Sequence, residues 1–297
     1  MLSKFINILK SYIGIAPKSF NVLVNVGATR YTISRIYNNA LSWFAEDFEN
    51  YEPELNKLLT AVFQLKEGAF IDIGANIGQT FLKVLAIDKQ RQYIGFEPQP
   101  HGCFLVDDFI AKNNLGNCTV LPVALSDKAG VVRLGVNRSN DVAASFVEEY
   151  RPSGFYSQYK TIVTVTGDDM FRFLGIASFS LIKIDAEGAE LEVLRGLSST
   201  LISHKPYILF EILPHFLFHT GEELDTETSE IRDRRHDKID SLLRGHGYSI
   251  FQVQEGAGVN EVAAIKAAKR DKYNYIAVPA TETDAFCKEY MNCSVST

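Results

Sequence analysis

Short apolar runs alternate with stretches of helical spacing along most of the chain. The apolar runs carry little charge and lie at 69–73, 92–96, 118–123, 178–184 and 206–212. Apolar residues recur at helical intervals at 53–65, 79–87, 100–113, 189–201 and 231–246. Apolar strands that alternate with helices are typical of a mostly parallel sheet with helices on both faces. The pattern therefore predicts an α/β fold of this kind.

The two ends of the chain carry different patterns. Residues 21–26 and 31–36 are β-branched and aromatic runs around a short turn, which predicts a small hairpin in front of the sheet. Residues 248–254 and 273–278 are joined by a connection that is short for a helical crossover, so we expect an antiparallel pair at one edge of the sheet. We interpret 220–230 as an exposed loop and the residues after 279 as a loosely attached tail.

This pattern divides the chain into three parts. We expect an N-terminal helix and hairpin over 1–50, a main domain over 51–280 with an insertion around 137–160, and a tail over 281–297. The amphipathic stretch 1–17 is too short and interrupted to span a bilayer. We expect it to pack on the domain or on a second subunit, as in a homo-oligomer, with docking on a membrane surface as the alternative.

Composition narrows the class of partner. The formal net charge of -6 argues against nucleic acid and against anionic lipid. A hydrophobic content of 46% and a charged content of 22% are ordinary for a globular protein. The four cysteines are scattered and have no histidine cluster near them, which predicts reduced thiols in a cytoplasmic protein rather than a zinc site.

The first buried run leads directly into a glycine loop, A-F-I-D-I-G-A-N-I-G at 69–78. Asp72 is the one charged residue in this run, and Gly74 and Gly78 bracket a turn that precedes a helix. Such a loop lets the backbone approach a ligand closely and offers N–H donors to it. Glu97-Pro98 ends the next run, about 23 residues beyond Gly74, which is close to the spacing of a ribose-binding carboxylate.

Further polar residues follow the later strands. Asp185 and Glu187 come after the run 178–184, and Glu211 and His215 lie at or beyond the end of the run 206–212. Because the carboxyl ends of parallel strands meet at one edge of a sheet, where such sheets bind ligands, these residues are candidates for chemistry.

Two segments without periodicity are candidates for acceptor binding. The insertion 137–160 is rich in Asn, Ser, Gly and Tyr and includes Arg151 and Tyr156, which suits a lid or recognition loop, although a flexible surface excursion is the alternative. Tyr51 and Glu52 precede the helix before the glycine loop. They either fold back over the pocket or form an ordinary helix connection.

Four motifs in this order resemble the FkbM family of S-adenosylmethionine-dependent methyltransferases: F-I-D-I-G-A-N-I-G, F-E-P, A-L-S-D and L-I-K-I-D-A-E-G-A-E-L-E-V-L-R-G. The resemblance covers residues 51–213. It implies a Rossmann-like seven-stranded sheet and O-methylation of a hydroxyl on a small molecule or glycan, often a sugar or glycosylated natural product. The cofactor-binding residues that it implies are Asp72, Gly74, Ala75, Asn76 and Gly78 in the loop, Glu97 and Pro98 at the ribose, and Ala124, Leu125 and Ser126 near the adenine.

Methyl transfer needs an in-line arrangement of donor and acceptor and a group that takes the hydroxyl proton. We favour Asp185 and Glu187 as orienting or proton-accepting groups and His215 as a secondary candidate. Alternatively, Asp185 contacts the methionine end of the cofactor, Glu187 caps the next helix and His215 is an ordinary loop residue. We expect no metal, although Asp185, Glu187 and Glu211 have oxygen ligands suited to magnesium.

Two other functions compete with this hypothesis. A nicotinamide-dependent oxidoreductase also has a strand, a glycine loop and a later acidic residue, but G-A-N-I-G departs from G-x-G-x-x-G and Asp72 at the strand end favours the methyltransferase pattern. A catalytically idle cofactor-binding or scaffold protein is the second alternative, and the set of Asp72, Glu97 and Asp185 argues against it.

Overall fold

The computed structural model describes residues 19–36, 52–138, 140–217, 221–254, 258–267 and 273–293. The helix expected over 1–17 and the candidate Tyr51 lie outside these residues.

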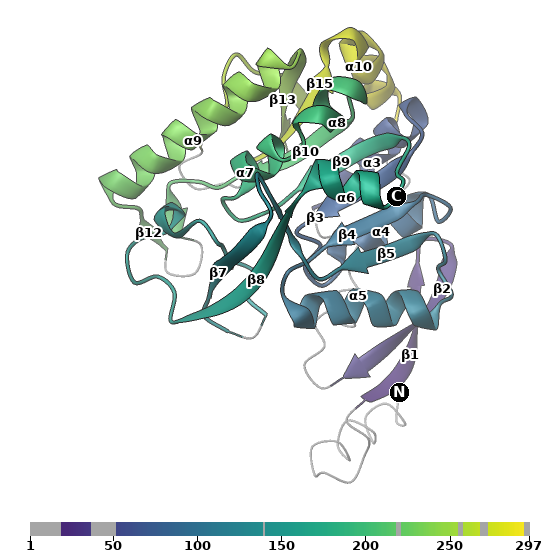
Figure 1. Cartoon of the computed structure of the whole chain (residues 1–297). Helices are drawn as coiled ribbons and strands as arrows, with labels where there is room; N and C mark the ends of the chain where they lie inside the picture. The colour runs from purple at the N-terminus through teal and green to yellow at the C-terminus, as the bar shows by residue number, and fades with distance from the viewer. Residues whose placement is uncertain are drawn as a thin grey trace.

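A central sheet of eight strands organises the chain, in the order β14-β13-β15-β10-β9-β3-β4-β5 (Figure 1). Five neighbouring strands are parallel to one another: β10 (Tyr207–Ile212), β9 (Phe179–Ile184), β3 (Ala69–Ile73), β4 (Tyr93–Phe96) and β5 (Cys118–Leu121). The expected strand pair closes the sheet: β15 (Tyr273–Pro279) is antiparallel to β10 and to β13 (Tyr248–Gln254). The predicted Rossmann-like seven-stranded sheet is confirmed, and the short β14 (Gly258–Glu261) adds an antiparallel eighth strand at the edge.

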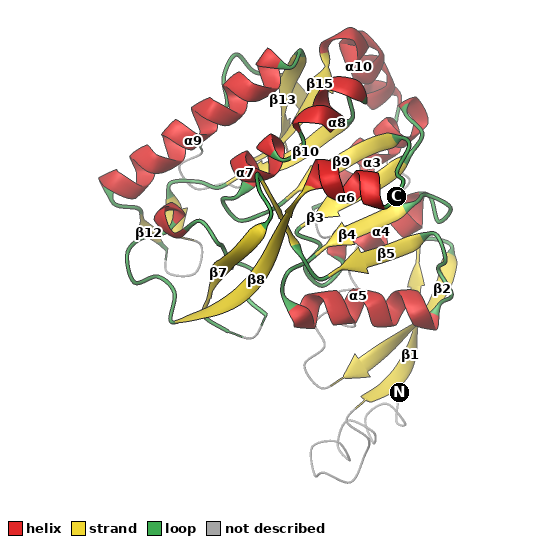
Figure 2. Cartoon of the chain, in the orientation of Figure 1, coloured by secondary structure: helices red, strands yellow, loops and turns green. Residues whose placement is uncertain are grey.

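Helices cover both faces of this sheet, because successive residues of each buried strand point to opposite sides (Figure 2). Phe70 of β3 belongs to the core on one face, whereas Ile71 and Ile73 belong to the core on the other. The Phe70 face is covered by α3 (Pro53–Leu65), α4 (Gln79–Ile87), α5 (Pro100–Lys112) and α10 (Thr283–Asn292). The opposite face is covered by α6 (Gly167–Phe173), α7 (Glu190–Arg195), α8 (Ser198–Ser203) and α9 (Thr226–Gly245).

Smaller sheets flank the central one. The hairpin β1 (Ser19–Val26) and β2 (Thr29–Ile36) is antiparallel, as expected, and its buried residues join the core under α4 and α5. A three-stranded sheet in the order β6-β8-β7 projects beside the main sheet, with bounds β6 (Ala124–Ser126), β7 (Gly130–Val136) and β8 (Gln158–Thr166). The remaining short elements are η1 (Glu148–Tyr150), β11 (Phe216–Leu217), β12 (Glu222–Glu223) and η2 (Ala280–Glu282).

Three sequence-based expectations about helices are wrong. The stretch 189–201 forms two helices, because a Cβ at Gly196 would lie 2.0 Å from the carbonyl oxygen of Ser126, so the chain turns where it touches β6. Part of the expected loop 220–230 is helical, since Asp225 caps α9 by accepting the Thr228 N–H. The residues after 279 are not loosely attached, because α10 buries Phe286 completely in the core.

Candidate cofactor and acceptor site

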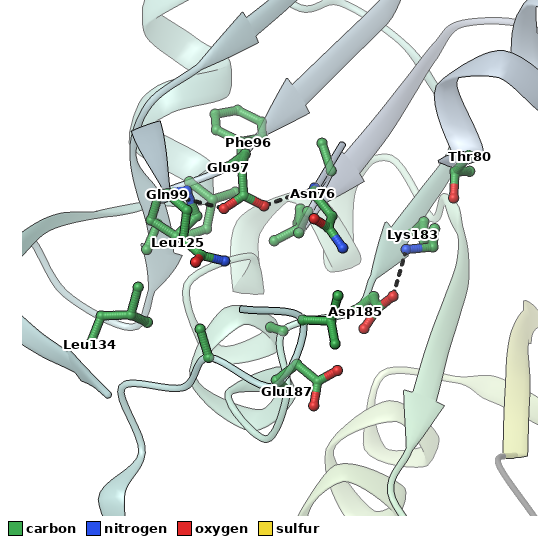
Figure 3. Close-up of a pocket in the computed structure, with 18 of the residues that line it drawn as sticks. Asn76, Thr80, Phe96, Glu97, Gln99, Leu125, Leu134, Lys183, Asp185 and Glu187 are labelled. Carbon is green, nitrogen blue, oxygen red and sulfur yellow. Dashed lines mark hydrogen bonds and ion pairs between the residues drawn. The ribbon is translucent and has the colours of Figure 1, made fainter. Parts of the chain in front are cut away.

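A cavity of about 310 Å3 opens at the carboxyl ends of β3, β4 and β9 (Figure 3). Polar groups line one part of it and apolar side chains line the other. The polar or loop residues are Glu52, Gly74, Ala75, Asn76, Gln79, Thr80, Glu97, Pro98, Gln99, Asp141, Lys183, Asp185 and Glu187. The apolar residues are Ile73, Phe96, Val123, Ala124, Leu125, Leu134, Val142, Ala144, Phe146 and Ala186.

The β3–α4 loop forms the floor of the cavity and can be built only with the residues found there. Gly74 has a φ of 84°, and a Cβ on it would lie 1.9 Å from the carbonyl oxygen of Asp185. The N–H groups of Gly74 and Ala75 both donate to the carbonyl of Phe96, at 2.9 and 3.1 Å. Asn76 adopts a φ of 49°, a conformation that Asn tolerates better than most residues. The loop is therefore fixed to β4 and lies directly against the end of β9.

Glu97 lines the cavity, and backbone N–H groups hold both of its carboxylate oxygens. Its Oε2 accepts the N–H of Asn76 and its Oε1 accepts the N–H of Gln99, each at 2.8 Å. Burial raises the pKa of Glu97 to about 7, although these two N–H donors act in the opposite direction. Because a carboxylate oxygen has two lone pairs, each oxygen keeps the capacity to accept one further hydrogen bond.

A buried lysine connects the glycine loop with the end of β9. Lys183 Nζ lies 3.1 Å from Asp185 Oδ2 and 3.7 Å from Asp72 Oδ1, and Asp72 also accepts the hydroxyl of Tyr93 at 2.8 Å. Burial alone would lower the pKa of Lys183, but the carboxylates of Asp185 and Asp72 outweigh it and raise that pKa. Burial likewise raises the pKa of Asp72, against the effect of Lys183. Asp72 does not line the cavity itself, but it contacts Lys183, which does.

Two carboxylates of the cavity wall sit on a strained backbone. Glu52 and Glu187 have φ values of 44° and 51°, in the left-handed region that non-glycine residues seldom adopt. Among the described residues, five non-glycine residues have positive φ, and three of them, including Asn76, line this cavity. Glu187 Oε2 accepts a hydrogen bond from Arg151 Nη2 at 2.5 Å. Backbone strain of this kind costs free energy and is concentrated at functional sites, so it favours a functional role for this part of the wall.

The insertion between β7 and β8 forms one wall of the cavity and is not a surface excursion. The side-chain amide of Gln99 pairs with the backbone N–H and carbonyl of Asp141, at 2.8 and 2.9 Å. Asn140 donates to the side-chain oxygen of Asn76 at 3.2 Å. Phe146 and its neighbours complete the apolar part of the cavity together with Leu134 of β7.

The structure brings most of the candidate residues together. Thirteen of the 23 lining residues were not among the sequence candidates. The clearest of these are Lys183, Gln79, Thr80, Gln99, Leu134, Asp141 and Phe146. The candidates that line the cavity are Glu52, Gly74, Ala75, Asn76, Glu97, Pro98, Ala124, Leu125, Asp185 and Glu187. The only sequence signal for Lys183 was its place in the K-I-D-A-E-G-A-E motif.

Other candidates lie away from the cavity wall. Gly78 is the N-cap of α4, Ser126 is buried in β6, and Arg151 stands behind Glu187. Tyr156 donates its hydroxyl to the carbonyl of Ala143, Glu211 is buried in β10, and His215 Nε2 lies 2.9 Å from Asp233 Oδ1. Their proposed roles in acceptor binding or catalysis stay predictions.

In the part of the chain that the structure describes, no group of three or more His, Cys, Asp or Glu side chains is arranged to hold a metal ion. No helix there is long and apolar enough to cross a membrane. The cytoplasmic location and the homo-oligomer stay predictions.

Residues 72–250 match the model of the methyltransferase FkbM domain. The chain belongs to the FkbM methyltransferase family. It is thus an S-adenosylmethionine-dependent methyltransferase, as the motifs implied.

Individual relatives are distant from this FkbM protein. The hexuronic acid methyltransferase AglP of Haloferax volcanii is 24% identical over 187 residues, which are 62% of this chain and 70% of that protein. The crystal structure of an FkbM methyltransferase from Methylobacillus flagellatus is 16% identical with a TM-score of 0.42, over 71% of this chain and 43% of that one. An O-methyltransferase from Bacillus cereus in complex with SAH is 13% identical with a TM-score of 0.41, over 80% of this chain and 86% of that one.

Proposed function

We propose that the cavity binds S-adenosylmethionine and that the enzyme methylates a hydroxyl of a sugar, glycan or glycosylated natural product. The observation that carries this proposal is the combination, within one cavity, of an apolar part, a doubly held carboxylate at Glu97 and the tight loop at Gly74. S-adenosylmethionine carries groups that match these features: an apolar adenine ring, ribose hydroxyls and a charged amino-acid tail.

The residues of the cavity fit such a cofactor from one end to the other. Phe96, Leu125 and Leu134 offer apolar surface for the adenine, and the free acceptor capacity of Glu97 suits the ribose hydroxyls. The Lys183–Asp185 pair beside the loop offers both signs of charge for the amino and carboxylate groups of the tail. When bound, the cofactor supplies a methyl group on a positively charged sulfur.

The carboxylates at the polar end suit a hydroxyl acceptor. In the transfer, a C–O bond forms to the acceptor oxygen while the C–S bond breaks and its electron pair stays on sulfur. The hydroxyl proton passes to a carboxylate, for which we propose Glu187 or Asp185, because both line the cavity beside the loop. Glu52 also lines the cavity and is a candidate to hold further hydroxyls of the acceptor. The AglP relative supports a sugar as the acceptor class.

Labelled S-adenosylmethionine and a panel of methyl glycosides, including neutral hexosides, amino sugars and hexuronates, test this proposal. We expect methyl transfer to at least one hydroxyl, and we expect Glu187→Gln to lower turnover by about 100-fold or more while SAH still binds. Glu230→Gln, an exposed position on α9, is the matched control and keeps wild-type turnover.

Calorimetric titrations with SAH and NAD separate the alternatives. Binding of SAH without turnover on any hydroxyl would favour the catalytically idle protein. Binding of NAD but not SAH would contradict the assignment of the cavity.

A further inference from the structure

Helix α9 directs three polar side chains at the wall behind Glu187, although none of them lines the cavity. Arg232, Arg235 and His236 are spaced at i, i+3 and i+4, so they share one face of the helix. Arg232 is completely buried and His236 nearly so. Burying a guanidinium costs free energy unless its N–H groups are hydrogen-bonded, so the hydrogen bonds of Arg232 are needed to offset this cost.

Arg232 holds the backbone of the insertion. Its Nε and Nη2 donate to the carbonyl oxygen of Tyr150, at 3.2 and 3.0 Å, and its Nη1 donates to the carbonyl of Pro214. Its guanidinium also lies over the Tyr150 ring, 4.6 Å from the centroid. The position of residue 150 is thereby fixed from α9.

His236 fixes the ring of the same tyrosine. Its Nε2 lies 3.1 Å from the Tyr150 hydroxyl. Burial lowers the pKa of His236 to about 3 and raises the pKa of Tyr150 above its usual range. The hydrogen bond therefore joins a neutral imidazole to a neutral hydroxyl, and neither group changes charge near neutral pH.

The ring of Tyr150 packs against the loop that follows β9. A Cβ on Gly188 would lie 2.3 Å from the Tyr150 ring, so the ring occupies the space beside this glycine. Arg235 donates to the Gly188 carbonyl at 2.9 Å. On the other side, Glu190 Oε1 accepts the N–H groups of Ala186 and Gly188, both at 3.1 Å. The residues on either side of Glu187 are therefore both fixed.

Glu187 itself is held by the residue next to this tyrosine. Arg151 follows Tyr150 directly, is largely buried, and reaches Glu187 Oε2 at 2.5 Å. One arrangement thus determines both the backbone of Glu187, through Gly188, and its carboxylate, through Arg151.

We infer that Tyr150 and Arg232 are positioning residues for the acceptor side of the site: they hold Glu187 in its left-handed conformation with its carboxylate on the cavity wall. This inference rests on the proposed function only for the role of Glu187 toward the acceptor. The cofactor contacts at Glu97 and Gly74 lie on other elements.

Arg232→Met, Arg232→Lys and the control Arg234→Met test the inference. Arg234 is exposed and lies outside the face formed by 232, 235 and 236. Three quantities are measured on each full-length variant: deuterium uptake of peptides over 184–192, the Kd of SAH, and kcat and KM on the methyl glycoside with the highest turnover.

For Arg232→Met we expect exchange over 184–192 to speed up about tenfold or more, because the loop loses its support. We expect kcat/KM for the glycoside to fall about 10- to 100-fold, since a displacement of about 1 Å has effects of this size. The Kd of SAH should stay within about threefold of wild type. Arg232→Lys should recover part of both losses, and Arg234→Met should behave as wild type.

Tyr150→Phe removes only the hydroxyl that contacts His236. We expect smaller changes in the same direction, with faster exchange over 184–192 and a lower kcat/KM but an unchanged Kd of SAH. This variant tests the inference if Arg232→Met does not fold. Wild-type exchange and kcat/KM in the folded variants would overturn the inference. A loss of SAH binding in proportion to turnover would also overturn it, because it would show a general structural role. The exchange measurement needs no acceptor, so a failure of the proposed function to find a methylated glycoside leaves this test intact.

Discussion

At the scale of single residues, two opposing effects set the pKa of Glu97. Two backbone N–H donors favour its ionised form, but burial disfavours that form more strongly and raises its pKa to about 7. The unliganded enzyme therefore changes the charge of this group close to neutral pH. An ionised carboxylate accepts hydrogen bonds from ribose hydroxyls better than a neutral carboxyl, so cofactor binding should depend on pH.

We predict that SAH binds more tightly as the pH rises through 7. Since only the ionised fraction of Glu97 binds well, the Kd should fall roughly 20-fold between about pH 5.5 and 7.5 and then level off. Isothermal titration calorimetry over this range measures it. Glu97→Gln should bind weakly at every pH without this dependence, and Glu148→Gln, an exposed position of the insertion, should retain it. A flat profile in the wild type would contradict the role of Glu97.

At the scale of elements, the apolar patterns predicted the strands and missed features set by long-range contacts. β3, β9 and β10 agree closely with the predicted runs because buried parallel strands are apolar throughout. The first turn of α9 was missed because it is polar and has no apolar spacing. The break between α7 and α8 depends on the contact of Gly196 with Ser126, which no local pattern contains.

The residues of the candidate site also divide into those that a local pattern predicts and those that depend on long-range contacts. The glycine loop, Glu97 and Asp185 were predictable because each lies at the end of a strand within a contiguous motif. Gln99, Asp141 and Phe146 were not, because the insertion reaches the cavity through pairings between distant segments. Arg232 on a polar helix looks like an exposed residue in the sequence, and only the packing of α9 against Tyr150 buries it.

Helix α10 shows what a short C-terminal element can contribute. Phe286 packs against the rings of Tyr207, Phe251 and Tyr290, with centroids 5.8, 5.6 and 6.0 Å away. It therefore joins two strands of the sheet to the helix.

We predict that Phe286→Ala lowers the free energy of unfolding by about 3–5 kcal/mol, the usual cost of removing a fully buried aromatic ring. Urea denaturation followed by circular dichroism measures this change. Met291→Ala, on the same helix but exposed, should change stability by less than about 0.5 kcal/mol. Equal effects of the two substitutions would show that α10 does not pack as described.

At the scale of the whole molecule, two carboxyl groups near the cavity link stability to pH. Burial raises the pKa of both Glu97 and Glu190 to about 7, well above the usual value of 4.5. Between these pH values the folded protein holds protons at these groups that the unfolded chain has lost. The stabilisation is therefore fully present below about pH 4.5 and is lost as the pH rises through 7.

Glu190→Gln separates one of these contributions from the rest. The amide oxygen of glutamine can still accept the N–H groups of Ala186 and Gly188, but it cannot ionise. We predict that the loss of unfolding free energy between about pH 5 and pH 8 becomes smaller in this variant, by at most about 3 kcal/mol. Glu223→Gln, an exposed position, should leave the slope unchanged. Denaturant unfolding at several pH values measures the slope, and an unchanged slope in Glu190→Gln would mean that this carboxyl ionises at its ordinary pH in the folded enzyme.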